Sequence, residues 1–392
     1  MKKKIMIFCD SYLPSYKSGG GMWTVVNLVD RFHDRYDFSV VTRNYDSKSD
    51  RMPFTSVRTD EWNSCGNANV FYASSRRLTS ADIAKRVAEI EPDMAYLNSA
   101  FSVPVLKFLF ARKKKMIREI PVILAPCGEL SRGALSVKPL KKKVFIKYAR
   151  LFNLYDRLIW KASSDLEADE IANVMGGICD TIVAPDLIPR TILPGFSPER
   201  KPVKKKGSVK FIFLSRVVPK KNLLYVLERL SHIRDGEIVL DIVGDPEDRT
   251  YWQECLKSIS RLPKTIAVNI VGPVSYGDGL ELLIANHFFI LPTLNENFGY
   301  VFIESLAAGC PILISDQTVW SRVEREGSGW VVPLENPDVW SQRIKHCVEM
   351  DSKDYLAMSR SARRYAEDWL SDPTLEEATH KVLQKGLNHR AG

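Results

Sequence analysis

The sequence predicts an α/β protein made of two doubly wound, parallel-sheet domains. Short apolar runs typical of buried strands alternate with stretches whose apolar residues recur at helical spacing. A length of 392 residues with 45% apolar residues suits two ordinary cores. A stretch rich in proline and lysine, from Pro185 to Lys206, divides the chain near its middle. We therefore expect one domain at residues 1–195 and a second at 196–370.

Five short apolar runs are the expected strands of the first domain: Lys4–Cys9, Phe38–Thr42, Ala95–Asn98, Val122–Ala125 and Thr181–Ala184. Helical patterns separate them, for example at residues 80–91 and 103–114, and Ser164 or Asp165 is expected to cap a later helix. The glycines Gly19, Gly20 and Gly21 follow the first strand, and a helix should begin near Met22. Because glycine has no Cβ, the backbone there can approach a ligand closely.

The second domain is expected to open with the strand Val209–Leu214, followed by Arg216, Lys221 and then a helix. Two further strands, Ile238–Gly244 and Ile266–Gly272, both end in glycine. The sheet pattern ends at Val331–Pro333, and two strongly periodic helices follow, at Tyr355–Trp369 and Leu375–Leu387. A strand-end arginine and a helix-start lysine would converge in a parallel sheet, because ligands bind at the carboxyl ends of its strands.

The stretch Asn295–Leu313, NENFGYVFIESLAAGCPIL, concentrates the chemistry of the chain. It follows a strand-like run that Pro292 ends, and its polar loop leads into a helix near Val301. The first N–H groups of a helix have no intrahelical partners and so favour an anion. Glu296 and Glu304 flank this helix start, and carboxylates accept hydrogen bonds from hydroxyls. The layout suits a nucleoside diphosphate sugar, which carries hydroxyls on both sides of its phosphates.

This stretch resembles the Glu-x7-Glu signature of retaining glycosyltransferases of the GT-B fold, glycosyltransferase family 4. The resemblance implies two Rossmann-like domains facing across a cleft, with a nucleotide-sugar donor on the second domain and an acceptor on the first. It implies that Glu296 contacts the donor sugar hydroxyls and Glu304 the ribose. Five residues between them are the implied donor-binding set, with Gly244 as a nucleoside contact: Asn297, Phe298, Gly299, Tyr300 and Val301.

Two other segments resemble elements of the same family. Gly19 and Gly20 match its glycine loop, which faces the donor phosphates and the acceptor. Arg216 and Lys221 match its Arg-x4-Lys element, which holds the donor diphosphate. A charge pair about 4 Å apart at an effective dielectric near 20 contributes roughly 4 kcal/mol, whereas a helix terminus contributes about 0.3 to 1 kcal/mol. The two cations should therefore dominate stabilisation of the leaving diphosphate.

One segment departs from the family pattern. The run Ala125–Ser131, APCGELS, resembles a Pro-His-Gly or Pro-Arg-Gly segment, but Cys127 takes the middle position. An imidazole contact to the transferred sugar is therefore absent, and Glu129, Ser131 and Arg132 are candidates to replace it; a plain loop is the alternative. GT-B relatives also return the final helix to the first domain, which here implies residues of about 371–392.

Composition limits where the protein works. No apolar run is long enough to cross a bilayer, and the N-terminus does not read as a signal peptide, so we expect a cytoplasmic protein. Seven scattered cysteines without a CxxC pair argue against a disulfide framework or a structural zinc site. Cations interleaved with aromatic residues over residues 107–150 suit an anionic membrane surface, with solvated basic helix faces as the alternative. No nucleic-acid signature accompanies them.

The function expected from these features is retaining, metal-independent transfer of a hexose from a UDP- or GDP-linked donor. The acceptor would be a glycan or lipid-linked glycan, in surface polysaccharide synthesis, and no cofactor beyond the donor is expected. Arg216, Lys221 and Glu296 are the expected catalytic residues, with Glu296 orienting the sugar. Two alternatives remain: a sugar-nucleotide epimerase of the same fold, and a catalytically inactive donor-binding subunit.

Overall fold

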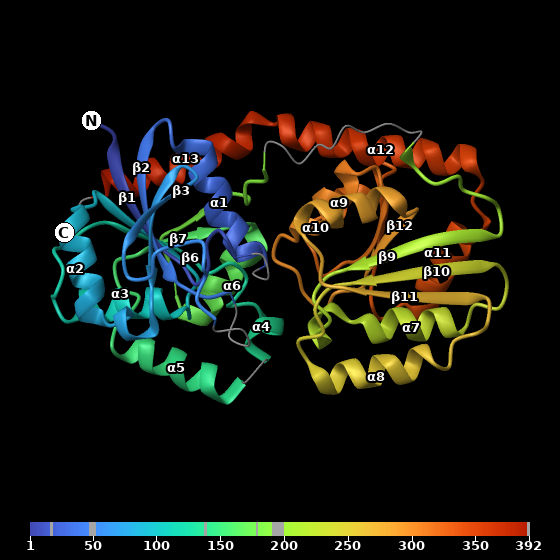
Figure 1. Cartoon of the computed structure of the whole chain (residues 1–392), viewed down its shortest axis with the longest axis horizontal. Coiled ribbons are helices and arrows are strands. Elements are labelled where there is room, and N and C mark those ends of the chain that lie inside the picture. The colour runs from blue at the N-terminus through green and yellow to red at the C-terminus, as the bar shows by residue number, and fades with distance from the viewer. Residues whose placement is uncertain (16–18, 47–51, 137–138, 178, 190–199, 390–392) are drawn as a thin grey trace. The chain divides into compact units, whose positions relative to one another are not determined.

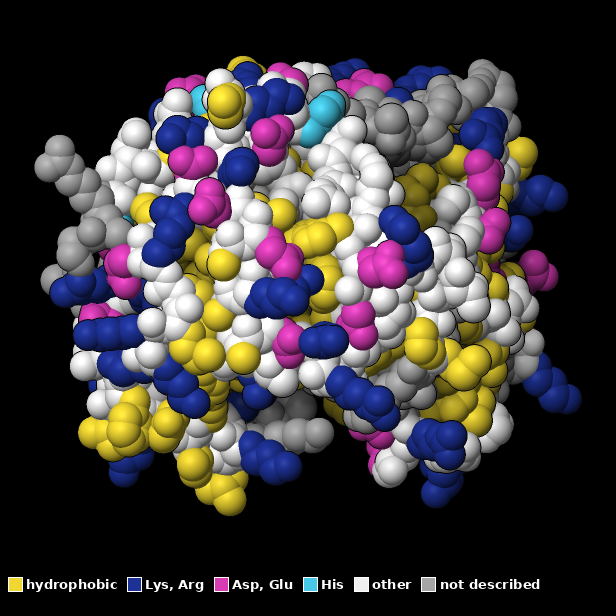
Figure 2. Space-filling view, turned by 60° about the vertical axis from the view of Figure 1, so that its left-hand side comes forward, with side chains coloured by type: hydrophobic (Ala, Val, Ile, Leu, Met, Phe, Trp, Pro, Cys, Tyr) yellow, Lys and Arg dark blue, Asp and Glu magenta, His cyan; other side chains and the backbone are white. Residues whose placement is uncertain are grey.

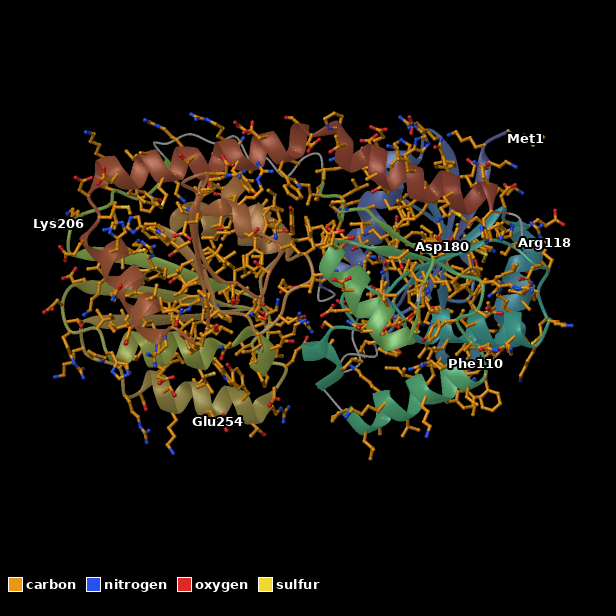
Figure 3. All side chains as sticks on the ribbon, turned by 180° about the vertical axis from the view of Figure 1, so that it is seen from behind. Met1, Phe110, Arg118, Asp180, Lys206 and Glu254 are labelled. Carbon is orange, nitrogen blue, oxygen red and sulfur yellow. The ribbon has the colours of Figure 1, made fainter. Side chains whose placement is uncertain are left out.

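The computed structural model describes residues 1–15, 19–46, 52–136, 139–177, 179–189 and 200–389 (Figure 1). The chain divides into two compact units, and each is described by itself. Unit 1 comprises Met1–Pro189 and Pro373–Gly392, and unit 2 comprises Arg190–Asp372. The border that we expected at residues 195 and 196 lies outside the described residues. In Figure 3 the labelled Met1 and Asp180 mark unit 1, and Lys206 and Glu254 mark unit 2.

An eight-stranded sheet forms the centre of unit 1, in the order β3-β4-β2-β1-β5-β6-β7-β8. All neighbouring strands are parallel except β3 and β4, which are antiparallel. The strands are β1 (Lys3–Phe8), β2 (Tyr36–Arg43), β3 (Trp62–Cys65), β4 (Ala68–Ala73), β5 (Met94–Asn98), β6 (Val122–Ala125), β7 (Ile159–Ala162) and β8 (Thr181–Val183). The sequence pattern did not predict β3, β4 or β7.

Helices cover both faces of this sheet, because alternate strand residues point to opposite sides. Met6 and Phe8 join a core with the helices α2, α3, α5 and α6, whereas Ile5 and Ile7 join a core with α1 and α13. The helices are α1 (Gly20–Phe32), η1 (Ser75–Arg77), α2 (Ser80–Ile90), α3 (Val103–Lys113), α4 (Arg132–Ser136), α5 (Pro139–Leu151), α6 (Asp165–Met175) and α13 (Pro373–Asn388). Ser164 caps α6 by accepting a hydrogen bond from the Glu167 N–H.

The final helix α13 is tied to unit 1 by packing and by ion pairs. Val382 and Leu383 are buried in the same core as α1. Gly386 lies so close to the sheet that an added Cβ would come within 2.2 Å of the Met94 sulfur. Arg31 on α1 reaches Glu376 at 3.3 Å. Residues far apart in the sequence therefore share one core.

A six-stranded, fully parallel sheet forms the centre of unit 2, in the order β11-β10-β9-β12-β13-β14. The strands are β9 (Ser208–Leu214), β10 (Glu237–Val243), β11 (Ile266–Gly272), β12 (Phe288–Leu291), β13 (Ile312–Ser315) and β14 (Gly329–Val332). The helices are η3 (Pro219–Lys221), α7 (Leu223–Ser231), α8 (Arg249–Ile259), α9 (Tyr276–Ala285), α10 (Tyr300–Ala307), η4 (Ser321–Val323), α11 (Pro337–Glu349) and α12 (Ser352–Ser371). Figure 1 shows α9, α10 and α12 on one side of the sheet and α7 and α8 on the other.

The two sheets confirm the prediction of two doubly wound, parallel-sheet domains. Central strands such as β12 and β13 are short and wholly buried, because helices shield both faces of a parallel sheet from water, whereas the edge strand β11 is largely exposed. Among the described residues no helix has both the length and the apolar character needed to cross a membrane.

Candidate functional site

The strand order of unit 2 brings the loops that carry the predicted residues to the same edge of the sheet. The chain runs outward from β9 to β10 and β11, then returns to pair β12 with the other edge of β9. Loops at the carboxyl ends of β9 and β12 therefore diverge and leave a crevice, the usual ligand site of such sheets. Arg216 and Lys221 follow β9, and Glu296 follows β12. The site residues thus come from the two loops that flank this switch point.

Lys221 and Glu296 form a shielded ion pair. The Lys221 ammonium contacts a Glu296 carboxylate oxygen, and the two side chains are only 12% and 14% exposed. Backbone hydrogen bonds hold the two loops together, since the Leu294 N–H donates to the Lys220 carbonyl at 2.8 Å. The Glu296 N–H donates to the Gln317 carbonyl at 2.9 Å, which fixes the carboxylate from the β13 side.

Arg216 is the outer cation of the site and is half exposed. Its Nη1 lies 3.0 and 3.3 Å from the two carboxylate oxygens of Glu247, which follows β10. Arg216 also acts on Glu296. Burial alone would raise the pKa of Glu296, but the charges of Lys221, Lys220 and Arg216 outweigh it and lower that pKa. The charges of both predicted cations therefore act on Glu296, and Lys221 also contacts its carboxylate.

Gly299 explains why the motif has glycine before the helix. It lies at φ +76°, and an added Cβ would come within 2.6 Å of the Phe302 ring and 2.8 Å of the Glu296 Cγ. Only glycine fits this left-handed, crowded position. Gly299 is also the N-cap residue of α10 and provides no side-chain cap. The first N–H groups of α10 therefore lie beside Glu296 and are suited to an anionic ligand.

Glu304 lies on α10 in a very different environment from Glu296. Burial raises the pKa of Glu304 to about 7. Its charge in turn contributes to the raised pKa of Tyr276, the first residue of α9, so the two side chains lie near each other. The described residues offer no ion pair to this carboxylate. A buried carboxyl without a cation is suited to a neutral hydroxyl partner, such as the ribose hydroxyls that the resemblance implies.

Of the predicted residues between the two glutamates, Phe298 anchors the loop with its side chain, and three others place their backbone near the helix start. Phe298 is 3% exposed, and its ring packs against Tyr300, Trp320 and Trp369 at centroid distances of 5.1, 5.3 and 6.2 Å. Trp320 Nε1 donates to the Phe298 carbonyl at 2.5 Å. These contacts make Phe298 an anchor of the loop rather than a side chain available to a ligand. The other three predicted residues lie at the start of α10 or just before it, so their backbone groups are near the helix start: Asn297, Tyr300 and Val301.

Gly244 fixes the end of β9 through a close backbone approach. It has φ +140°, and an added Cβ would come within 2.0 Å of the Ser215 carbonyl oxygen. Backbone pairing between the segments after β9 and β10 continues past Gly244, since the Val217 N–H donates to the Asp245 carbonyl at 2.9 Å. A side chain at Gly244 would therefore displace the backbone from which Arg216 projects.

The predicted residues of unit 1 lie around the corresponding switch point, between β1 and β5. Gly19 is the N-cap of α1, and Gly20 is already its first helical residue, two positions before the start that we expected. Cys127 follows β6, with its thiol 3.2 Å from the Asn98 amide oxygen, and burial raises its pKa well above the usual range. Cys127 is therefore a protonated thiol and a weak nucleophile.

Glu129 holds its own loop together. It accepts hydrogen bonds from the Ser99 hydroxyl and from the N–H groups of Ala100 and Phe101. Burial raises its pKa, although these donors stabilise the charged form. Both carboxylate oxygens are thus engaged within unit 1, which indicates a positioning role. Arg132 begins α4, and its side chain lies outside the described residues.

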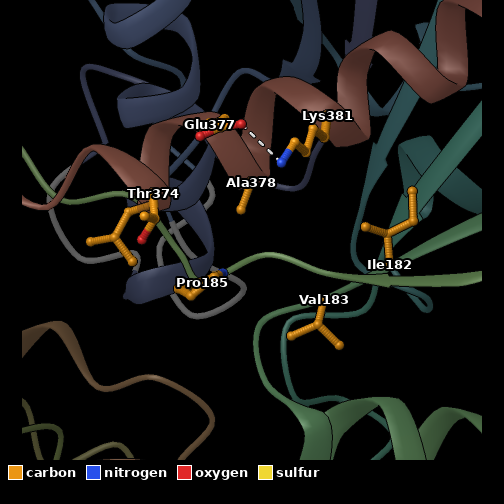
Figure 4. Close-up of a pocket in the computed structure, with 8 residues that line it drawn as sticks. Ile182, Val183, Pro185, Thr374, Glu377, Ala378 and Lys381 are labelled. Atoms are coloured by element: carbon orange, nitrogen blue, oxygen red, sulfur yellow. Dashed lines mark ion pairs between the residues drawn. The ribbon is translucent and has the colours of Figure 1, made fainter.

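Two other kinds of site, a metal cluster and a pocket, concern the described residues alone. No group of three or more His, Cys, Asp or Glu side chains is arranged to hold a metal ion. A pocket of about 350 Å³ lies in unit 1, where α13 covers β8 (Figure 4). Its lining is mostly apolar, and its Glu377 and Lys381 pair with each other at 2.9 Å. It contains none of the predicted site residues.

A family of known proteins matches the second unit of the chain, and curated relatives match about half of its length. Residues 197–365 match the family "Glycosyl transferases group 1". A D-inositol 3-phosphate glycosyltransferase from Streptomyces bingchenggensis is 25% identical over 233 residues, which are 54% of this chain and 49% of the relative. A protein of the same description from a Nocardioides species is 25% identical over 55% of this chain and 52% of the relative. The chain thus spans about half the length of these curated relatives.

Solved structures match over nearly the whole chain. A structure of Anabaena Alr3699/HepE in complex with UDP and glucose has a TM-score of 0.71 at 18% identity, covering 98% of this chain and 100% of that one. Sucrose-phosphate synthase from Thermosynechococcus elongatus has a TM-score of 0.73 at 12% identity, covering 98% and 99%. The two parallel-sheet domains and these likenesses show that the chain has the GT-B fold. The second unit is similar to the group 1 glycosyltransferases, since the match to that family lies within residues 197–365.

Proposed function

We propose that the protein is a retaining glycosyltransferase that moves a hexose from a nucleoside diphosphate sugar to a glycan or lipid-linked glycan. The observation that carries the proposal is the shielded Lys221–Glu296 ion pair beside the N-terminus of α10, with the Arg216 charge also acting on Glu296. Two cations and the positive end of a helix suit a diphosphate. An ionised carboxylate beside them suits the hydroxyls of the attached sugar.

The chemistry needs charge stabilisation at the leaving group. When the bond between the sugar C1 and the β-phosphate oxygen breaks, the nucleoside diphosphate takes the electron pair. Arg216, Lys221 and the first amides of α10 would stabilise that growing charge. The acceptor hydroxyl forms the new bond to C1 from the same face and gives its proton to a phosphate oxygen of the leaving group. The two cations would take the part that a divalent metal plays elsewhere, so we propose metal-independent transfer.

The sugar is expected to be oriented by Glu296, because its position is fixed before the donor arrives. Its N–H is held by Gln317 and its charge by Lys221. Glu304 would accept from the ribose, and Gly244 would border the nucleoside. Gly19 and Gly20 of unit 1 are proposed to face the donor phosphates and the acceptor, and Cys127, Glu129 and Arg132 the acceptor side.

The relatives support a uridine nucleotide as the first donor to test, since Alr3699/HepE has been seen with UDP-glucose. WaaG, described as involved in lipopolysaccharide biosynthesis, has a TM-score of 0.63 at 12% identity. These likenesses favour surface polysaccharide synthesis, and we propose a cytoplasmic protein peripheral on an anionic membrane. GDP-linked sugars remain the second donor class.

A donor screen tests the proposal. The protein is mixed with UDP-glucose, UDP-galactose and GDP-mannose in EDTA, and thermal shift and release of nucleoside diphosphate are measured. We expect one donor to raise Tm and to be consumed with an acceptor glycan, giving a product whose anomeric proton keeps the configuration of the donor by NMR.

Other outcomes would contradict specific parts of the proposal. Isomerised free donor without an acceptor would identify an epimerase. Donor binding with neither hydrolysis nor transfer would favour an inactive binding subunit. Activity that EDTA abolishes and Mg²⁺ restores would overturn metal independence.

A further inference from the structure

The helix α5 presents large hydrophobic side chains to solvent. Five of them, in the helix and directly after it, have exposed fractions of 75%, 61%, 42%, 74% and 48%: Leu140, Val144, Tyr148, Leu151 and Phe152. Exposed hydrophobic side chains that stand singly need no explanation, but a contiguous group marks an interaction surface. Figure 2 shows hydrophobic side chains beside lysine and arginine side chains at its lower edge, where Figure 1 places α5.

These side chains form one continuous stripe along the helix. At about 100° per residue, Leu140, Val144, Tyr148 and Leu151 fall within an arc of about 80°. The Tyr148 and Phe152 rings are in contact, with centroids 4.4 Å apart, and extend the stripe past the end of the helix. The stripe therefore has the length of the whole helix.

The opposite face of α5 is anchored in the core of unit 1, so the stripe cannot turn inward. Ala149 is 1% exposed, and the Phe145 ring meets Phe101 edge-on at 5.8 Å. Lys142 Nζ donates to the Ala134 carbonyl at 2.6 Å. The orientation of the helix is thus fixed by contacts on its inner side.

Cations border the stripe on both sides. By the same helical spacing, Lys143 and Lys147 lie on one flank and Lys141 on the other, and all three are exposed. The sequence from Pro139 to Phe152 contains no acidic residue. A second copy of this face would place like charges against each other, which disfavours self-association through it.

We propose that this face of α5 docks unit 1 on an anionic lipid bilayer. An apolar stripe edged by lysines is the pattern of a helix that lies in the plane of a membrane interface. The aliphatic and aromatic side chains enter the region below the headgroups, and the lysines contact lipid phosphates. The docking surface is the apolar stripe of α5 with its flanking lysines, and all of these residues belong to unit 1. The proposal holds whether or not the donor chemistry of unit 2 is as proposed.

Co-sedimentation of the full chain with vesicles tests the proposal. The vesicles are phosphatidylcholine alone, or with 30% phosphatidylglycerol, at low and high salt. We compare V144S/L151S, which breaks the stripe, with K143Q/K147Q, which removes charge. Matched controls are L166S/V203S, at side chains that are 52% and 76% exposed, and K345Q/K353Q on exposed helix faces of unit 2.

We expect the wild type and both controls to bind the anionic vesicles, more weakly at high salt, and each test variant to bind at least tenfold more weakly. Wild-type protein that stays in the supernatant at low salt would overturn the proposal. Binding by both test variants equal to wild type, or equal binding to neutral vesicles, would do the same. A dimer that V144S/L151S dissociates in light scattering, without vesicle binding, would assign the face to a second copy. Thermal melts establish folding, and the lysine variant keeps the test decisive if the serine variant unfolds.

Discussion

Two ion pairs of unit 2 join neighbouring loops but differ in exposure. The side chains of Lys221 and Glu296 are 12% and 14% exposed, whereas those of Arg216 and Glu247 are 50% and 41% exposed. An exposed pair typically contributes about 0 to 1 kcal/mol to stability. Removing one partner of a buried pair costs about 3 to 5 kcal/mol, because the other charge remains without compensation. The inner pair should therefore be part of the fold and the outer pair mainly part of the function.

Replacing Lys221 with methionine should have the largest effect, because it removes a diphosphate contact and leaves Glu296 as a lone buried charge. We expect turnover to fall more than hundredfold, and the free energy of unfolding to fall by about 3 kcal/mol. Initial rates at saturating donor and urea unfolding measure the two. The matched control K221M/E296Q should regain part of the stability but no activity. Turnover within tenfold of wild type in K221M would break the comparison.

Replacing Arg216 with glutamine should lower activity with little change in stability. Loss of a cation at the leaving diphosphate is expected to reduce turnover about a hundredfold, or roughly 2.7 kcal/mol of barrier. The free energy of unfolding should change by less than about 0.5 kcal/mol, since the Arg216 side chain is half exposed. The control is R343Q, which removes an arginine paired with Glu324 at 3.1 Å, away from the site loops. Destabilisation of R216Q similar to that of K221M would show that the two pairs do not differ.

Glu304 adds a third case to the comparison of the two ion pairs, because among the described residues it is a buried carboxyl with no ion pair. Its pKa of about 7 is raised by burial, so between pH 4.5 and 7 the folded state holds a proton that the unfolded state has lost. Its contribution to stability is present below about pH 4.5 and lost as pH rises through 7. Relative to E304Q, the ligand-free wild type should lose on the order of 2 kcal/mol across this range.

Urea unfolding of wild type and E304Q at matched pH values measures this effect. The difference between them is needed, because His287 acts in the opposite direction. Burial and then the charges of Lys204 and Lys201 lower the pKa of His287 to about 4, so its contribution rises with pH between 4 and 6.5. A difference that does not vary with pH would mean that Glu304 titrates normally.

The sequence predicted the parts of this site that depend on residues adjacent in the chain. Pro292 ends β12, glycine precedes α10, and Arg216 follows β9, as their neighbours in the sequence imply. The parallel sheet then brings the loops after β9 and β12 together without further information. In unit 2 the local pattern predicted the strands but not the helices α8, α9 and α11. In unit 1 it missed β3, β4 and β7; β3 and β7 are short and include polar residues, which leaves no clear pattern.

Contacts between distant residues could not be read from the pattern. Glu247 lies 31 positions after Arg216, and nothing in its surroundings marks it as a partner of that arginine. The three donors that engage Glu129 likewise come from another loop. The opposite pKa shifts of Glu296 and Glu304 depend on which buried carboxylate has a lysine beside it. A spacing of eight residues carries no such information.

The smallest predicted effect concerns Glu247, which pairs with Arg216 where the donor diphosphate is proposed to bind. The donor must displace this carboxylate, so E247Q should bind it more tightly. Because an exposed pair contributes at most about 1 kcal/mol, we expect a decrease in donor KM of about threefold, with kcat unchanged. The advantage should shrink in 0.5 M salt, which screens exposed charges. E324Q, which removes the partner of Arg343, is the control. A higher KM in E247Q would instead mean that Glu247 holds Arg216 in the orientation that the donor needs.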